Sequence, residues 1–229
     1  MSDRILHPGL PAPVIVRRSK QARRLSLRVN VTLRAATLVL PQRVSHRAGM
    51  EFLNDHLDWI KERLDALPAA LPFREGASVP FLGRPHRITP APGARRGVWI
   101  EEDAIMVSGP VEFLPRRVAD FLKREAKERI WRLAPKMAQT IGKEVSKVRI
   151  GDPKSRWGSC NSKGNLAFSW RLVLAPEEIL AYVVAHEVAH LREMNHSAAF
   201  WDWVRVLHPD IETPRRWLKT NGAGLYRYG

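Results

Sequence analysis

The stretch that decides the fold is PEEILAYVVAHEVAHLREMNHSAAFWDWV, residues 176–204. Its beginning predicts an α-helix, because a proline in the first turn and two glutamates after it suit the positive end of a helix dipole. The residues that follow are apolar on nearly every side, which is typical of a buried helix. Ala181, Ala185 and Ala189 form a small-residue stripe that would let another helix approach closely, and the helix predicted over 115–133 is a candidate.

Two histidines on this helix stand four residues apart. His186 and His190 leave the same face, one turn from each other, so both imidazoles can reach one Zn²⁺ at ~2.0–2.1 Å. Glu187 stays beside them, where its carboxylate can take a proton from metal-bound water without being a ligand. Without partners these polar groups would be costly to desolvate on a buried helix, and a metal removes that cost. The HExxH spacing therefore predicts a metal site.

A catalytic zinc keeps three protein ligands and one open position, so a third ligand is needed. His196 is the best candidate, since it lies six residues beyond His190, just past the expected helix end, where the chain can turn back. The spacing equals that of the metzincins. Their turning glycine is replaced here by Glu193, which leaves Asn195 as the residue that most readily adopts a left-handed conformation.

Other residues compete for this role. Glu212 could be a downstream carboxylate ligand, although the Thr-Pro pair after it favours a helix start. Cys160 is a ligand that zinc accepts, but a thiolate beside three histidines would close the site. His208 lies in a Leu-His-Pro-Asp turn and is interpreted as structural rather than as a ligand, with support of a ligand or stabilisation of an oxyanion as the alternative roles. Ser197 is expected to cap the helix that follows His196.

The rest of the chain alternates between strand and helix patterns, which favours an α+β fold. These patterns predict an antiparallel meander over 13–17, 23–31 and 35–40, a helix over 45–66, hairpins within 68–113, and helices over 115–133, 197–207 and 213–220. We expect a β-rich N-terminal region with one helix at 13–112 and a catalytic region at 113–229. Together they are expected to form one compact unit.

A loop, PKSRWGSCNSKG at 153–164, joins a strand that begins at Val145 to a second strand over 165–170. Because the second strand leads into the metal-binding helix, we expect it to be a sheet edge on which an extended peptide binds. The residues predicted to contact a peptide are Asn165, Leu166, Ala167 and Phe168, with Arg156 as a further candidate. Trp157 is expected to pack under the helix, and Gly158 to make a turn.

Several ordered motifs resemble the YgjP-like metallopeptidases, small cytosolic bacterial zincins related to SprT-like proteins. The matches are R-W-G-S-C at Arg156–Cys160, N-W-R-L at Ser169–Leu172 with serine replacing asparagine, HExxH at His186–His190, M-N-H-S-x-x-F-W at Met194–Trp201, and an early R-R-L-x-L-R-V segment. The resemblance spans about residues 15–220. It implies a zincin-like fold, a small antiparallel or mixed sheet packed on helices, and a zinc-dependent peptidase. Its ligands would be His186, His190 and His196, and its general base Glu187.

The 229-residue chain carries 38 Lys and Arg against 23 Asp and Glu, a net charge of +15. This balance indicates either weak nucleic-acid association through a basic surface or a basic proteome with no specific partner. The alternatives to a general peptidase are thus a hydrolase of DNA-bound proteins and a noncatalytic zinc-binding scaffold. A single cysteine, no signal-peptide pattern and no apolar run of ~18 residues favour a cytoplasmic protein without a membrane partner.

Overall fold

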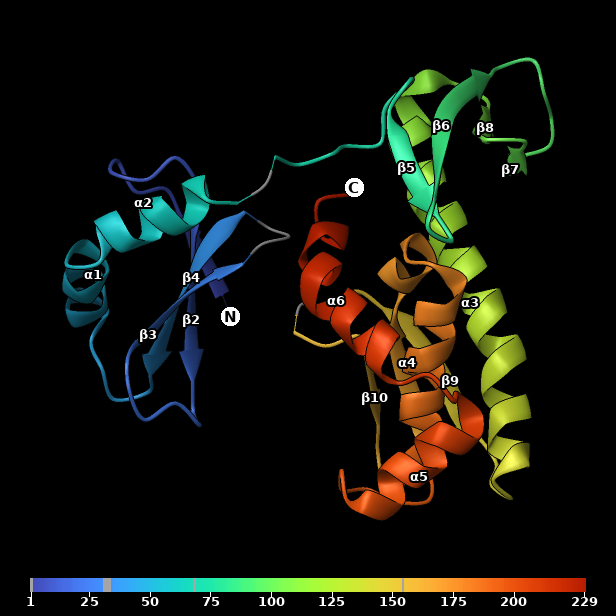
Figure 1. The fold of residues 1–229 in the computed structure, drawn as a ribbon. Helices are drawn as coiled ribbons and strands as arrows, with labels where there is room; N and C mark the ends of the chain where they lie inside the picture. The colour runs from blue at the N-terminus through green and yellow to red at the C-terminus, as the bar shows by residue number, and fades with distance from the viewer. Residues whose placement is uncertain (1, 31–33, 68, 154) are drawn as a thin grey trace. The chain divides into compact units, whose positions relative to one another are not determined.

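The computed structural model describes residues 2–30, 34–67, 69–153 and 155–229. The chain divides into two compact units, Met1–Ala69 and Ala70–Gly229 (Figure 1). The division therefore differs from the expected single unit with regions at 13–112 and 113–229. The reason is that the strands between residues 78 and 108 pack on the long helix that follows them, and so belong to the second unit.

The first unit is a four-stranded sheet with two helices. Its elements are β1 (Ser2–Ile5), β2 (Val14–Ser19), β3 (Ser26–Asn30), β4 (Ala35–Pro41), α1 (His46–Asn54) and α2 (Leu57–Asp65). The strand order is β1-β2-β4-β3, with β2 parallel to β4, so the predicted meander is wrong. Only β3 and β4 form the expected antiparallel pair, and local periodicity could not reveal that β2 joins the far side of β4. Residue 31, the last of the strand predicted over 23–31, lies outside the described residues.

The single helix expected after Ser45 is two helices. Ser45 caps α1, since its hydroxyl accepts a hydrogen bond from a backbone N–H three residues on, at 3.1 Å. The backbone of His56 then leaves the helical region (φ −119°, ψ 15°), and its Nδ1 lies 2.8 Å from the carbonyl oxygen of Phe52. The helix resumes as α2, which buries Ile60 and Leu64 in the core of this unit.

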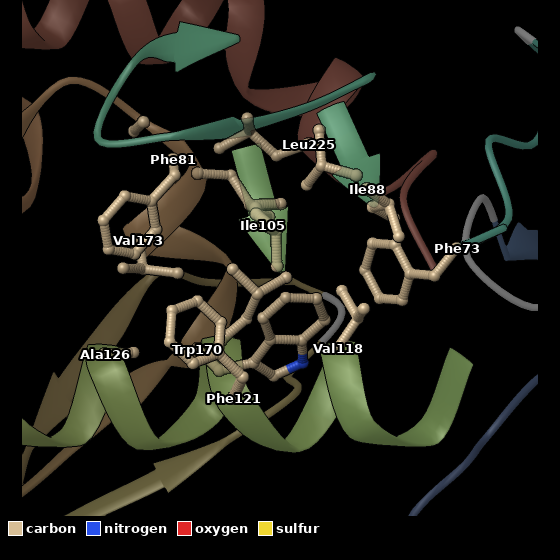
Figure 2. Close-up of a cluster of buried hydrophobic side chains, with 14 of the residues drawn as sticks. Phe73, Phe81, Ile88, Ile105, Val118, Phe121, Ala126, Trp170, Val173 and Leu225 are labelled. Carbon is tan, nitrogen blue, oxygen red and sulfur yellow. The ribbon is translucent and has the colours of Figure 1, made fainter. Parts of the chain in front are cut away.

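The second unit begins with another four-stranded sheet, which packs on a long helix. Its elements are β5 (Ser78–Phe81), β6 (Arg84–Ala91), β7 (Val98–Glu101), β8 (Ala104–Ser108), a 3-10 turn η1 (Val111–Phe113) and α3 (Leu114–Thr140). The order β5-β6-β8-β7 confirms two hairpins, joined by a parallel pair as in the first unit. Figure 2 shows the core between sheet and helix, where Phe81, Ile88 and Ile105 meet Val118 and Phe121 of α3.

The remaining elements surround the stretch that carries the HExxH motif. They are β9 (Lys147–Gly151), β10 (Gly158–Cys160), β11 (Asn165–Ser169), a 3-10 turn η2 (Trp170–Leu174), α4 (Glu177–Ala189), α5 (Ala198–Leu207) and α6 (Glu212–Leu225). The strand order is β10-β11-β9, with β11 antiparallel to β10 and parallel to β9. Leu166 and Phe168 of β11 share a core with α4, and α3 packs along α4. The expected α+β class and buried helix are thereby confirmed.

Over the part of the chain that the structure describes, no helix combines the length and the apolar character that a membrane span needs.

Arg171, in η2, ties the C-terminal segment to this sheet. The residue is 3% exposed, and its Nε and Nη2 donate to the two carboxylate oxygens of Asp152 at 2.8 and 3.2 Å. Its Nη1 donates to the carbonyl oxygens of Leu225 and Tyr228 at 3.0 and 2.6 Å. The guanidinium carbon also lies 4.5 Å from the ring centroid of Trp170. A buried cation is tolerated here because its donors are satisfied.

Replacing Arg171 by methionine should lower the free energy of unfolding of the second unit by about 3 kcal/mol, because the Asp152 carboxylate and two carbonyls lose their donor. Urea denaturation followed by tryptophan fluorescence measures the change. Arg205→Met removes an exposed pair with Asp202 and should cost less than about 0.5 kcal/mol. Equally small effects of the two substitutions would contradict the role given to Arg171.

Candidate active site

The two histidines and the glutamate lie at the C-terminal end of α4. Glu187 is buried, at 6% exposed, whereas His186 and His190 are half-buried. The helix ends at Ala189, with His190 as its C-cap residue. The apolar body of α4 is held between the β10-β11-β9 sheet and α3. The packing of apolar side chains thus positions a polar cluster where the helix approaches the surface.

The structure brings the three predicted ligands together. One ligand nitrogen from each of His186, His190 and His196 lies within 4.8 Å of the others, and the Nε2 atoms of His186 and His196 are 3.1 Å apart. Two nitrogens that each lie ~2.0–2.1 Å from one tetrahedral ion are about 3.3 Å apart, so this spacing fits a bound cation. The Nδ1 of His190 lies 3.0 Å from the carbonyl oxygen of Glu193, and donation there leaves Nε2 free to bind a metal.

The surroundings of the histidines favour the neutral imidazoles that a metal requires. Burial is the main reason that the pKa of His186 falls to about 4, and the neighbouring charges of His190 and His196 contribute to this shift. Burial also lowers the pKa of His190, although its hydrogen bond to Glu193 acts in the opposite direction. Since a metal binds only the deprotonated nitrogen, neither ring needs to lose a proton near neutral pH.

The turn after His190 returns His196 to the site without a left-handed residue. Asn195 is not among the described residues with positive φ, so the turn differs from that of a metzincin. It is anchored instead by Arg192, whose Nε donates to a carbonyl oxygen just beyond α3 at 2.6 Å. The guanidinium carbon of Arg192 also lies 5.2 Å from the ring centroid of Trp203 in α5.

The first turn of α5 supplies an aromatic support for the imidazoles. Ser197 caps the helix as predicted, accepting a hydrogen bond from the N–H of Phe200 at 3.3 Å. The buried Phe200 ring then lies 4.9, 4.5 and 4.7 Å, between centroids, from the three imidazoles. Trp201 stacks on His196 at 5.9 Å. The sequence signal for this support is the F-W pair of the M-N-H-S-x-x-F-W motif, to which no role at the site was assigned from sequence.

Glu187 points towards strand β10 rather than into solvent. A Cβ atom on Gly158 would lie 2.5 Å from Cγ and 2.6 Å from Oε1 of Glu187, so only glycine leaves room for this carboxylate. Burial raises the pKa of Glu187, the positive charge of Arg156 partly offsets this effect, and the resulting pKa is about 7. A carboxyl group with such a pKa can hold or release a proton near neutral pH.

The rival ligands lie elsewhere or are unsuited to the role. Glu212 begins α6, where its Oε1 accepts a hydrogen bond from Arg215 at 2.9 Å. Burial and, to a lesser extent, the charge of Glu187 raise the pKa of the Cys160 thiol to about 11, which disfavours the thiolate. The Nδ1 of His208 lies 2.6 Å from the carbonyl oxygen of Asp210, within a turn. Among the described residues, none of these three belongs to the histidine cluster.

The predicted peptide-binding strand is wrong. β11 lies between β10 and β9, so its backbone has no free edge to extend. Leu166 and Phe168 are 0% and 1% exposed, whereas Asn165 and Ala167 lie on the opposite face of the sheet. The alternation of apolar and polar residues along the strand could not reveal that β11 has a neighbouring strand on each side. The edge beside Glu187 is β10.

The R-W-G-S-C segment also differs in detail from expectation. Gly158 lies in strand β10 and not in a turn. Trp157 was expected to pack under α4, but it also packs against α6. Its ring stacks on Tyr226, with 5.2 Å between the ring centroids, and lies close to Gly222. Arg156 is exposed and near enough to Glu187 to influence its pKa. The segment therefore links the C-terminal helix to the carboxylate of the site.

Comparison with known proteins gives a family. Residues 23–221 match the sequence model of a family described as "YgjP-like, metallopeptidase domain". No curated protein matches the chain. Among solved structures, the chain is similar to the crystal structure of the metallopeptidase zymogen of Pyrococcus abyssi abylysin, with 26% sequence identity and a TM-score of 0.36. That alignment covers 43% of this chain and 97% of the other.

Replacing Gly158 by alanine should lower the free energy of unfolding of the second unit by about 1–3 kcal/mol, because the new methyl group overlaps Glu187. Urea denaturation measures this change in the free energy of unfolding. Gly93→Ala, with no atom within 4 Å of the added Cβ, serves as control and should change little. The penalty should largely disappear in a Glu187→Ala background. A penalty that persists there would show that the contact with Glu187 is not its cause.

Proposed function

This chain belongs to the YgjP-like metallopeptidase family, and from that premise we propose that it is a zinc-dependent peptidase in which Glu187 is the general base. The observation that carries the proposal is the cluster of three imidazoles, from His186, His190 and His196, beside one buried carboxylate. Family membership makes the chain a hydrolase of peptides that uses a metal. The identity of the metal and the roles of the residues are our proposal.

Zinc is the metal that suits this donor set best. Three imidazole nitrogens and one open position are a common catalytic arrangement for Zn²⁺, whereas Mg²⁺ and Ca²⁺ prefer oxygen ligands. When bound, the ion would polarise the peptide carbonyl and lower the pKa of water. The Phe200 ring beneath the imidazoles excludes solvent from one side and fixes their orientation.

Glu187 is placed to move the protons of the reaction. Its carboxylate Oε1 accepts a proton from the attacking water, and its pKa near 7 allows it to deliver that proton to the leaving nitrogen. Burial between α4 and β10 keeps the side chain in one position. The Arg156 charge nearby favours the ionised form that accepts the proton.

The peptide itself would pair with the free edge of β10. The N–H of Ser169 donates to the carbonyl of Trp157 at 2.8 Å, which marks these two residues as a hydrogen-bonded antiparallel pair. By the alternation of such pairs, the backbone groups of Gly158 and Cys160 point away from β11. A peptide bonded to these groups would run past Glu187, which touches Gly158.

A noncatalytic zinc scaffold accounts less well for the same observations. Three histidines are sufficient to hold the ion together with a water, and a scaffold has no use for a buried carboxylate beside them. Position 158 also accepts only glycine, because a side chain there would overlap Glu187. Both features support catalysis.

Replacing His196 by alanine should weaken zinc binding by more than about 100-fold, as should His190→Ala, because each removes one of three nitrogen ligands. Elemental analysis after dialysis against a weak chelator measures the bound zinc. Glu212→Ala and Cys160→Ser, which alter the rival ligands, should retain one zinc per chain. Full zinc occupancy in the His196 variant would remove this residue from the ligand set.

Replacing Glu187 by glutamine should leave zinc content and folding unchanged but lower peptide cleavage by about 10²–10⁴-fold, because the amide cannot accept a proton. Cleavage is followed by mass spectrometry on a pool of synthetic peptides, with zinc content measured on the same samples. Loss of zinc in proportion to loss of activity would mean that Glu187 is a ligand, against the mechanism above.

A further inference from the structure

The face of the β10-β11-β9 sheet that points away from α4 carries a shallow hollow. Ser159, Ala167 and Arg149 lie side by side across the three strands on this face. Because the first two side chains are small, they leave a space of about 400 Å³, which Arg156 also lines. The hollow therefore begins at β10, one of the two edge strands of this sheet.

The hollow presents positive charge that forms no ion pair among the described residues. Arg149 and Arg156 are both exposed, and no ion pair is formed by either guanidinium within the described ranges. Asp152 also lines the hollow, but both of its carboxylate oxygens accept hydrogen bonds from Arg171. The local charge available to a ligand is thus that of two arginines.

The hollow is adjacent to the catalytic groups. Gly158, one residue before Ser159, touches Glu187, and the charge of Arg156 acts on the same carboxylate. Successive side chains of a peptide strand paired with β10 point to opposite faces of the sheet. The peptide residue opposite Ser159 therefore projects its side chain on the face of the hollow, while its neighbours project towards the histidines.

We propose that this hollow selects peptide substrates with an acidic side chain at the position opposite Ser159, held by Arg149 and Arg156. The inference rests on the proposed function and adds the substrate class to it. Guanidinium groups bind carboxylates through paired, charge-assisted hydrogen bonds, which an uncharged amide of the same shape cannot reproduce. The selectivity is therefore for glutamate or aspartate over glutamine or asparagine at one position.

The test uses the full-length, zinc-loaded protein and pairs of ten-residue peptides that differ only by Glu or Gln, with the variable position moved along the peptide. The ratio of kcat/KM for Glu over Gln should reach about tenfold or more at one position. The double substitution Arg149→Glu with Arg156→Glu should abolish or reverse that ratio, and added salt should reduce it in the unmodified protein. Equal rates for Glu and Gln at every position would overturn the proposal.

A matched control separates local from global charge. Lys127→Glu with Arg132→Glu, on the exposed face of α3, makes the same change in net charge and should leave the ratio intact. Retention of the ratio in the Arg149/Arg156 variant overturns the proposal. If the same variant keeps the ratio but loses binding to duplex DNA, the two arginines bind a polyanion and not the acidic side chain of a peptide, which also overturns the proposal. Failure to cleave any peptide refutes the proposed function instead, and with it the premise of this selectivity.

Discussion

Burying a carboxylate and imidazoles on an apolar helix is the constraint on which the rest of the second unit depends. Glu187 and His186 would be poorly solvated at the end of α4, and the structure compensates by bringing a third imidazole, His196, to the same place. A cation shared by the three rings would satisfy one nitrogen of each ring at once. The glycine at position 158 then lets a strand approach the carboxylate closely.

The elements around this cluster are held by contacts far apart in the sequence. Phe200 of α5 supports the imidazoles, while Trp157 couples strand β10 to α6 through Tyr226. Arg171 fastens the chain end to the sheet through Asp152. The family motifs thus correspond to one connected body: R-W-G-S-C forms the edge strand beside the carboxylate, and W-R-L fixes the C-terminal segment. The F-W pair supports the three imidazoles.

Local sequence patterns predicted the helix, the histidines and the carboxylate, because a four-residue spacing on a helix determines which side chains share a face. The turn that returns His196 was also foreseeable, since few residues separate it from His190. The position of β11 within its sheet was not, because it depends on pairing with β9, whose residues precede it by a loop. Likewise, the parallel pairing of β2 with β4 and the division after Ala69 follow from nonlocal packing that alternation does not encode.

Zinc K-edge X-ray absorption spectroscopy on the purified, zinc-loaded protein tests the central claim most directly, because it reports the atoms around the ion. The account predicts three imidazole nitrogens and one oxygen at ~2.0–2.1 Å, which leaves one position for water or substrate. A sulfur scatterer at ~2.3 Å would place Cys160 in the ligand set and close the site, in contradiction to the account.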